Sequence, residues 1–380
     1  MNHLAHDVPS SPIDVIELRC EYSKNPLGID SRIPRLSWCI RSDRRGTKQS
    51  AFQVLVSNSE DKLSADIGDI WDSDKTLSNR SFSVEYGGKE LGSCERYFWK
   101  VKVWDEHDSP SNFSEISWWE MGLLDREDWK ANWIEGGKIL GTKFEIRSRP
   151  LKARAYITGL GFYELRINGR KVGDRVLDPA PSAAEKRVYY ATFDVSDYLV
   201  LGTNSVRILL GKGRETQQKV LAQFIVDQDD GTSISLGTDG NWKVSNDTPV
   251  VFDDLYDGEK YDARLEESTN HKISWTNCKL ADSSGIGEIS SSAFFPPIRV
   301  TASLKPIKII EPQPRTYVFD LGQNFSGWAR LRVRGPRSSE VTMRFAEVLN
   351  SDGSINVGTN RAAKATDVYI LSGSQDAEIF

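Results

Sequence analysis

One group of polar and aromatic side chains that could bind a ligand lies at residues 256–264, which read Tyr-Asp-Gly-Glu-Lys-Tyr-Asp-Ala-Arg. Glu259, Asp262 and Arg264 lie close together along the chain, with Tyr261 between the two acidic residues. A carboxylate, a guanidinium fork and a tyrosine ring can together bind the hydroxyl groups and the apolar face of a sugar. The alternative is an ion pair within the domain that locks a loop against a packed tyrosine, and the spacing alone favours this structural role.

A second polar group lies at residues 319–328, which read Phe-Asp-Leu-Gly-Gln-Asn-Phe-Ser-Gly-Trp. Its glycines let the backbone approach a neighbour closely, because glycine carries no side chain. The amide groups of Gln323 and Asn324 can both donate and accept hydrogen bonds at such a place. We expect these two side chains to bridge to a neighbouring domain, and a bound ligand is the alternative.

Neither the histidines nor the cysteines have the spacing of a transition-metal site. The four histidines form no H-x-H or H-x-x-x-H pair, and the four cysteines form no C-x-x-C pair. Acidic residues at 227–231 and 253–259 would suit Ca²⁺, which prefers oxygen ligands. Neither segment has EF-hand spacing, and solvated acidic turns are the simpler interpretation. We expect no required cofactor, and Ca²⁺ is the one ion that these loops leave open.

No motif for covalent or phosphate chemistry is present. The sequence contains no G-x-S-x-G string, and the glycines around Lys212 lack the following Ser or Thr of a phosphate-binding loop. A pair of carboxylates for glycoside hydrolysis is not ruled out by 54 acidic residues, but no local pattern marks two of them. We therefore assign no catalytic residue.

The overall charge argues against polyanionic partners. The 380 residues include 49 Lys and Arg against 54 Asp and Glu, which gives a net charge of −5. Nucleic acids and anionic membranes are not attracted by such a surface. No apolar run is long enough to span a membrane, and the first residues lack the apolar core of a signal peptide. We expect a cytoplasmic protein whose cysteines are mostly buried free thiols, with secretion as the alternative.

These residues must be positioned by strands, because helical periodicity is nearly absent. Short alternating runs separated by turn residues are typical of all-β sandwiches. Residues 51–57 and 97–104 are the clearest strands, and in the second we expect Lys100 and Lys102 to face water. Asn168 and Gly169 predict a hairpin turn, because both tolerate a positive φ.

Three consecutive β-sandwich domains account for the length of the chain. The first spans residues 13–122 and has the size of a fibronectin-like or immunoglobulin-like domain. A polar linker follows, and the second domain spans residues 134–299, where prolines interrupt the pattern. The third begins at residue 300, and residues 300–380 are short for a sandwich. We expect this third domain to be incomplete at its C-terminus, with unpaired strand edges and exposed apolar surface.

Six groups of strings, in order, resemble the N-terminal half of bacterial and fungal α-L-rhamnosidases, and the resemblance covers the chain from about residue 17 to its end. The strings are LRCEY (18–22) with NPLGI (25–29) and PRLSW (34–38), GFYELRING (161–169) with VGD (172–174), YYATFDV (189–195), GEKYDAR (258–264), DLGQN (320–324) with GW (327–328) and RFAEVL (344–349), and RAAKATDVY (361–369).

The resemblance implies a fibronectin-like or immunoglobulin-like domain, a jelly-roll-like domain and part of a concanavalin-like sandwich. It also implies a hydrolase that removes terminal α-linked L-rhamnose with inversion, whose two catalytic carboxylates lie in a downstream (α/α)₆ barrel. The acidic motif of that barrel does not occur in this sequence, so whether this chain is itself an enzyme stays open. Its expected role is that of a scaffold or carbohydrate-binding portion, and the alternative is a free-standing binder of rhamnose-containing glycans without catalysis.

In some members of that family the second domain is a rhamnose-binding module aided by calcium, and it resembles residues 134–299. The expected sugar-binding residues are Asn168, Asp174, Glu259, Tyr261, Asp262 and Arg264. Many relatives carry an aromatic turn shortly after the Val-Gly-Asp string, whereas residues 178–184 contain no aromatic residue here. A stacking platform is therefore missing at that position. The expected partners are rhamnose-containing glycans or glycosides and a catalytic domain.

Overall fold

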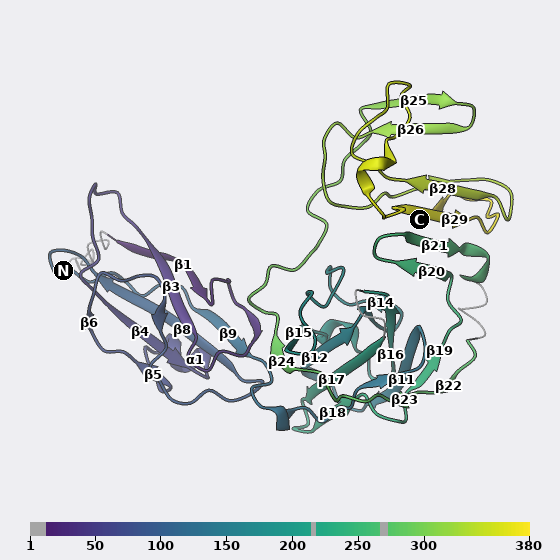
Figure 1. The fold of residues 1–380 in the computed structure, drawn as a ribbon. Coiled ribbons are helices and arrows are strands. Elements are labelled where there is room, and N and C mark those ends of the chain that lie inside the picture. The colour runs from purple at the N-terminus through teal and green to yellow at the C-terminus, as the bar shows by residue number, and fades with distance from the viewer. Residues whose placement is uncertain (1–12, 214–217, 267–272) are drawn as a thin grey trace, which may run out of the picture. The chain divides into compact units, whose positions relative to one another are not determined.

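The computed structural model describes residues 13–213, 218–266 and 273–380 (Figure 1). Strands make up nearly all of its regular structure, and the one α-helix among these residues, α1 (Glu60–Ser64), is five residues long. The prediction of an all-β protein built from several β-sandwich domains is confirmed. Among the described residues, no helix is long and apolar enough to cross a membrane.

The chain divides into two compact units. The first contains the residues up to Lys130 together with 189–193 and 288–296, and the second contains 131–188, 194–287 and 297–380. Strands β15 (Arg187–Asp194) and β24 (Glu288–Ser291) bring the two later segments into the first unit. The boundaries at 13–122, 134–299 and 300–380 stay a prediction.

The first unit is a sandwich of two sheets. One has the order β1-β3-β7 and the other β2-β9-β8-β4-β5, with β6 also paired to β4. The strands are β1 (Asp14–Cys20), β2 (Leu27–Ile29), β3 (Arg35–Arg41), β4 (Ala51–Ser57), β5 (Trp71–Asp72), β6 (Thr76–Leu77), β7 (Val84–Glu85), β8 (Arg96–Trp104) and β9 (Ser117–Met121). A single 3₁₀ turn, η1 (Arg126–Asp128), follows β9.

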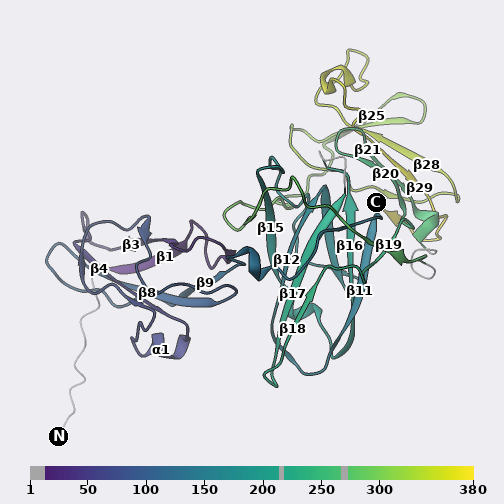
Figure 2. The same ribbon diagram turned by 60° about the horizontal axis from the view of Figure 1, so that its bottom comes forward.

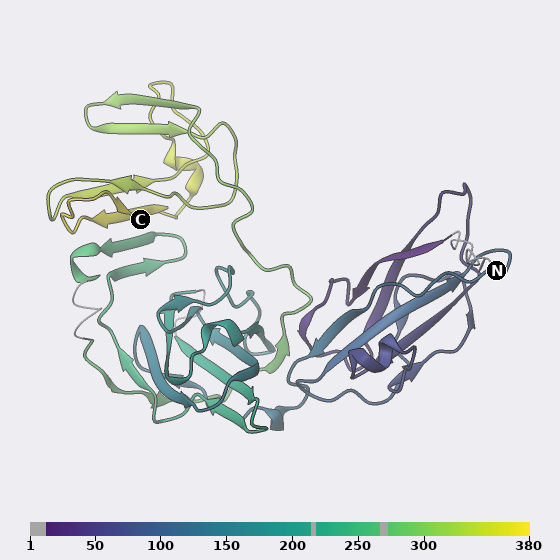
Figure 3. The same ribbon diagram turned by 180° about the vertical axis from the view of Figure 1, so that it is seen from behind.

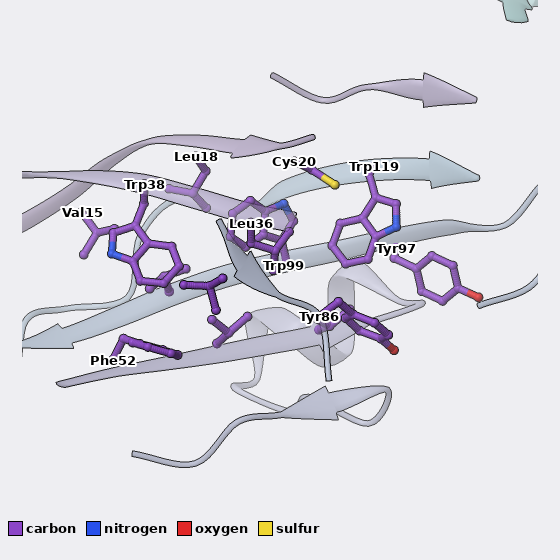
Figure 4. Packing of buried hydrophobic residues seen from close by; sticks show 14 of the residues in the cluster. Val15, Leu18, Cys20, Leu36, Trp38, Phe52, Tyr86, Tyr97, Trp99 and Trp119 are labelled. Atoms are coloured by element: carbon purple, nitrogen blue, oxygen red, sulfur yellow. The ribbon is translucent and has the colours of Figure 1, made fainter. Parts of the chain in front are cut away.

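Aromatic side chains fill the space between these sheets (Figure 4). Trp99 and Trp119 are fully buried and pack edge to face, with their ring centroids 6.3 Å apart. Trp38 packs edge to face against Phe52 at 5.2 Å. Buried aromatic residues of this kind contribute several kcal/mol each to stability, on the order of 3–5. These tryptophans therefore hold the core.

One predicted exposure is wrong. Lys100 on β8 is buried, because its ammonium group pairs with Asp66 next to α1 and lies 4.5 Å from the ring centroid of Phe113. The strand alternates as expected, but α1 and the segment that carries Phe113 cover its second face. The helix itself is capped by Ser59, whose side chain accepts a hydrogen bond from the backbone N–H of Lys62, and it is too short to give a periodic pattern.

The second unit contains a larger sandwich, seen as two layers in Figure 2. In one layer, β17 pairs with β10, β12 and β18, and β10 pairs with β23. The other has the order β14-β13-β16-β11-β19-β22. The strands are β10 (Ile134–Glu135), β11 (Ile139–Ile146), β12 (Pro150–Leu160), β13 (Phe162–Ile167), β14 (Arg170–Lys171), β16 (Gly202–Gly211), β17 (Lys219–Gln228), β18 (Ser233–Gly237), β19 (Lys243–Ser245), β22 (Thr276–Asn277) and β23 (Lys279–Leu280), with the 3₁₀ turn η2 (Ser196–Tyr198).

The predicted hairpin at Asn168 and Gly169 is confirmed. These residues join β13 to β14 with φ angles of 51° and 79°, and Ile167 pairs with Arg170 across the turn. A type I′ hairpin loop needs positive φ at both of its two positions, which is why Asn-Gly is favoured there.

A four-stranded sheet in the second unit joins distant segments of the chain. Its order is β20-β21-β29-β28, so the hairpin of β20 (Val250–Asp254) and β21 (Gly258–Asp262) pairs with β29 (Thr366–Ile370) (Figures 1 and 3). β21 and β29 run parallel, with Tyr261 opposite Tyr369. The remaining elements are η3 (Ala263–Leu265), β25 (Lys308–Gln313), β26 (Thr316–Asp320), β27 (Arg332–Val333), β28 (Glu340–Arg344), η4 (Val357–Asn360) and β30 (Glu378–Ile379).

The region after residue 297 leaves many large apolar side chains exposed. β25 and β26 form an isolated two-stranded ribbon, and β27 pairs with β30 alone. The exposed side chains include Ile307, Ile309, Tyr317, Phe319, Phe325, Trp328, Val348, Leu349 and Ile379. An isolated two-stranded ribbon is only marginally stable in water. Packing of other protein against these exposed apolar side chains would therefore stabilise the region.

All four cysteines are free, and the prediction that they are buried is correct for two of them. Cys20 and Cys278 are buried, Cys94 is half-buried and Cys39 is exposed.

Candidate functional site

Strand β21 and the turn that follows it carry four of the six predicted sugar-binding residues. Glu259 and Tyr261 lie on one face of the strand, since side chains alternate along it. Asp262 ends the strand and caps the 3₁₀ turn η3 by accepting a hydrogen bond from the backbone N–H of Arg264. The residues 259–264 are therefore brought together by local structure.

The side chains of Asp262 and Arg264 form a two-pronged ion pair. Arg264 donates from Nε to Oδ1 at 2.8 Å and from Nη2 to Oδ2 at 2.7 Å. Its third nitrogen, Nη1, donates to the hydroxyl of Ser338 at 2.9 Å. The hydrogen bonds from Arg264 hold the pKa of Asp262 below its ordinary value. This geometry fits the loop-locking alternative, because the fork that would grip a sugar is already bound to protein.

Tyr261 is also occupied by protein. Its ring stacks on Tyr369 with centroids 5.8 Å apart and planes 16° from parallel, and Phe380 lies 5.6 Å from it. The hydroxyl of Tyr261 donates to Oε1 of Glu266 at 2.8 Å. Burial raises the pKa of the Tyr261 phenol, and the Glu266 carboxylate raises it further. One ring face is thus used in packing between β21 and β29.

The carboxyl group of Glu259 accepts no hydrogen bond and forms no ion pair among the described residues. Its backbone N–H donates to Oδ1 of Asp367 at 2.9 Å, and Asp253 lies opposite it on β20. Burial raises the pKa of Glu259 to about 7, and the charges of Asp367 and Asp253 add to this, while Lys138 opposes it. A carboxyl group of this kind is about half protonated at neutral pH, so it can donate or accept a hydrogen bond to a hydroxyl.

Asn168 and Asp174 lie in the larger sandwich of the second unit. The amide of Asn168 donates to the carbonyl of Tyr198 at 3.0 Å and to Oδ1 of Asn204 at 2.8 Å, and it accepts from the backbone N–H of Ser205 at 2.9 Å. Its polar atoms are therefore engaged in holding the hairpin.

Asp174 is largely exposed and pairs with Arg299 at 3.3 Å. Among the described residues, no hydrogen bond or ion pair links Asn168 or Asp174 to the group at 259–264. Of the six predicted sugar-binding residues, the four on β21 and the turn after it thus form one group, and Asn168 and Asp174 lie apart from that group.

Sequence reasoning missed Asp367 as a neighbour of this group. Asp367 lies 108 residues after Glu259 and reaches it through the parallel pairing of β21 with β29. Lys138 was missed too; its ammonium group donates to the carbonyl of Val250 at 2.9 Å and lies 3.9 Å from Asp253. A parallel pair has no turn to reveal it in the sequence, so no local signal was available.

The expected bridging by Gln323 and Asn324 is not observed. Both side chains are exposed, and neither makes a hydrogen bond within the described part of the chain. The turn is held by Asp320 instead, whose Oδ1 accepts from the backbone N–H of Gly322 at 2.8 Å. The two amides are therefore open to a neighbouring domain or to a ligand, and both interpretations stay predictions.

The acidic loops do not gather into a metal site. Asp230 accepts hydrogen bonds from the hydroxyl groups of Ser148 and Thr232, and Asp257 pairs with Lys364. Among the described residues, no group of three or more His, Cys, Asp or Glu could hold a metal ion. These two acidic segments therefore form no ready-made Ca²⁺ site by themselves, and calcium binding stays a prediction. His3, His6 and His271 lie outside the described residues.

Three family models match successive parts of the chain. Residues 15–125 match the Rha78A-like N-terminal immunoglobulin domain, residues 148–302 match the alpha-L-rhamnosidase N-terminal domain, and residues 310–380 match the bacterial alpha-L-rhamnosidase concanavalin-like domain. The three matched domains follow one another in the same order as the six groups of strings found in the sequence.

Known proteins are similar over almost the whole chain. An alpha-L-rhamnosidase from Formosa agariphila is 32% identical over 90% of this chain and 41% of the relative. The structure of an alpha-L-rhamnosidase from Dictyoglumus thermophilum matches with a TM-score of 0.92 and 38% identity, over 97% of this chain and 45% of that one. An alpha-L-rhamnosidase from Streptomyces avermitilis, solved with L-rhamnose, matches with a TM-score of 0.90, 26% identity, and coverage of 97% and 54%. The chain thus spans about half or less of each of these proteins.

Proposed function

The chain belongs to the α-L-rhamnosidase family, and from this premise we propose that it forms the non-catalytic N-terminal portion of a hydrolase acting on terminal α-L-rhamnose. The observation that carries the proposal is the match with the Dictyoglumus thermophilum enzyme, which covers 97% of this chain but only 45% of that one. The three matched domains are β-sandwiches, and none of their residues is proposed to be catalytic. The two carboxylates that glycoside hydrolysis requires would lie outside residues 1–380.

The first part of the proposed role is that of a scaffold. The region after residue 297 exposes large apolar side chains such as Phe319, Phe325 and Trp328, and the open amides of Gln323 and Asn324 lie between them in sequence. An apolar surface with a few polar groups is what a tightly packed domain interface requires. We propose that this surface packs against the rest of the hydrolase and orients its catalytic domain.

The second part is carbohydrate binding by residues 134–299. Asp174 is exposed, and the carboxyl group of Glu259 accepts no hydrogen bond from the described residues, so these two are the best placed of the expected residues to meet sugar hydroxyls. Asn168, Tyr261, Asp262 and Arg264 would act by holding the surrounding loops. The specificity would be for rhamnose-containing glycans or glycosides, and Ca²⁺ is proposed only as an aid that raises affinity.

Hydrolysis of 4-nitrophenyl α-L-rhamnopyranoside by this chain alone tests the scaffold proposal. No release of 4-nitrophenol above the buffer rate is expected, whereas turnover comparable to that of a complete α-L-rhamnosidase would overturn it. A complete enzyme from the family, assayed in parallel, shows that the substrate and conditions are adequate.

The binding part, and the alternative of a free-standing glycan binder, are tested by titration calorimetry with L-rhamnose, with and without Ca²⁺. Heat of binding that falls in an Asp174→Asn or a Glu259→Gln variant would support sugar binding at these residues. A flat titration under both conditions would contradict both the binding part and the free-standing alternative, and would leave the scaffold role alone.

A further inference from the structure

The first unit contains a backbone turn whose residues do not suit its conformation. Cys20 and Ser23 exchange two backbone hydrogen bonds of 3.0 Å, so Glu21 and Tyr22 form a two-residue turn. Both have positive φ, 46° at Glu21 and 65° at Tyr22. Asn-Gly is the usual choice for such a turn, and larger side chains are strained in this region. Something else must therefore stabilise the turn.

An ion pair between the buried carboxylate of Glu21 and Arg35 holds the turn in place. The carboxylate of Glu21 is nearly inaccessible and accepts hydrogen bonds from the backbone N–H of Arg35 at 2.7 Å and from its Nε at 3.2 Å. The guanidinium of Arg35 lies 4.8 Å from the ring centroid of Tyr22, within the range of a cation–π contact. The Tyr22 ring is consequently fixed at the surface, where 47% of the residue remains exposed.

A second aromatic ring is fixed beside the first. The ring centroid of Phe82 lies 5.9 Å from that of Tyr22, and 61% of Phe82 is exposed. The backbone is again unusual here, because Ser83 has a φ of 49°. Arg80 braces the segment by donating from Nε to the carbonyl of Phe82 at 3.0 Å and from Nη2 to that of Ser83 at 2.6 Å.

Arg80 adds a positive charge to this surface. Within the described part of the chain its guanidinium bonds only to backbone carbonyls and forms no ion pair, and its Nη1 has no protein acceptor. By contrast, Arg35 is neutralised by Glu21. We call Tyr22, Arg35, Arg80 and Phe82 the Tyr22 patch. It combines two exposed rings with one uncompensated cation.

We propose that the Tyr22 patch binds an acidic glycan, with a pyranose ring against Tyr22 and Phe82 and its carboxylate on Arg80. The apolar face of a sugar packs on aromatic rings, and a guanidinium binds a carboxylate with two parallel hydrogen bonds. Two exposed rings held by a strained backbone are already in place before a ligand arrives, which lowers the entropic cost of binding. The site lies on the immunoglobulin-like domain, so this inference goes beyond the proposed function and does not depend on rhamnose recognition.

The test is titration calorimetry of the full chain with a galacturonate oligosaccharide, and with a neutral galactose oligosaccharide of the same length. We expect binding to the acidic oligosaccharide, and about tenfold weaker binding after Phe82→Ala. Tyr22→Asn should have a similar effect while keeping the turn, because asparagine adopts positive φ readily. Arg80→Gln should remove the preference for the acidic oligosaccharide, and added salt should do the same.

Tyr317→Ala is the matched control, since Tyr317 is an exposed aromatic residue of the second unit and its loss should leave the affinity unchanged. Circular dichroism of each variant shows that the sandwich is folded. The proposal is overturned if the wild-type chain gives no heat of binding, if it binds the neutral oligosaccharide equally well, or if folded Phe82→Ala and Tyr22→Asn variants bind as tightly as wild type. None of these outcomes bears on rhamnoside hydrolysis, so failure here is distinguishable from failure of the proposed function.

Discussion

Replacing Glu259 by glutamine should stabilise the sheet formed by β20, β21 and β29 at alkaline pH. Three carboxylates lie side by side on these strands, because Asp253 is paired with Glu259 across β20 and β21, and Asp367 accepts from the Glu259 backbone on β29. Like charges on neighbouring strands repel. The nearest balancing charge is Lys138, whose ammonium is 3.9 Å from Asp253.

The size of the effect follows from the pKa of Glu259, which is raised from 4.5 to about 7, first by burial and then by Asp367 and Asp253. One pKa unit corresponds to about 1.4 kcal/mol, which sets an upper limit of about 3 kcal/mol. Because the carboxyl group is only partly buried, we expect about 1–2 kcal/mol. The folded state binds the proton more tightly than the unfolded state, so stability is highest below about pH 4.5 and falls as the pH rises through about 7.

Amide hydrogen exchange in β21 is the appropriate assay, since it reports local opening in a chain of two compact units. The Glu259→Gln variant and the wild type are compared at the same pH, so that intrinsic exchange rates cancel. At pH 8.5 the variant should exchange about tenfold more slowly in β21, and the difference should shrink towards pH 5. Glu115→Gln, at an exposed carboxylate of the first unit, is the control and should have no effect. Equal protection of variant and wild type at both pH values would refute the reasoning.

Three further changes have clear expected outcomes. Arg264→Ala should destabilise the second unit by about 2–3 kcal/mol in urea unfolding, because it leaves the buried carboxylate of Asp262 without its partner; unchanged stability would argue against the locking role. Gly258→Ala should separate β21 from β29, visible as faster exchange in both strands, since Gly258 has a φ of 102° and an added Cβ would lie 2.2 Å from the carbonyl oxygen of Thr366. With a thiol reagent under native conditions, Cys39 should react first and the two buried cysteines only on unfolding; early labelling of a buried cysteine would count against the fold of its sheet.

Local sequence patterns were sufficient for some individual strands and turns. The largely apolar run at residues 51–57 predicted β4 with the bounds that the structure has, and nearly all of its residues are buried. The hairpin at Asn168 followed from the backbone preferences of two residues. Such features depend on neighbours in the sequence, which a single sequence records directly.

Contacts between distant segments were not predictable in the same way. The pairing of β21 with β29 joins residues that are more than 100 positions apart, and nothing near Glu259 indicates Asp367. The cover over Lys100 has the same origin, since Phe113 and Asp66 come from other parts of the domain. Packing between distant segments decides which polar residues are buried, and the alternation of residues along one strand does not reveal that packing.

The candidate site was predictable only in part for this reason. The local fork of Asp262 and Arg264 was expected from spacing, and the structure supports the loop-locking interpretation of it. The full hydrogen bonding of Asn168 depends on Asn204 and Ser205 from another strand. The strained turn at Tyr22 depends on the ion pair between the buried carboxylate of Glu21 and the exposed guanidinium of Arg35. Both had to be seen in three dimensions.

The size of the native protein tests the central claim most directly, namely that this chain is the N-terminal portion of a longer α-L-rhamnosidase. An antibody raised against the 42.7 kDa chain would be used to blot cells that express the native gene. Dividing 42.7 kDa by the 45% coverage of the Dictyoglumus thermophilum enzyme gives about 95 kDa for the whole protein. The account predicts a band near that mass that co-purifies with release of 4-nitrophenol from the α-L-rhamnoside. A single band near 42.7 kDa, without that activity, would contradict it.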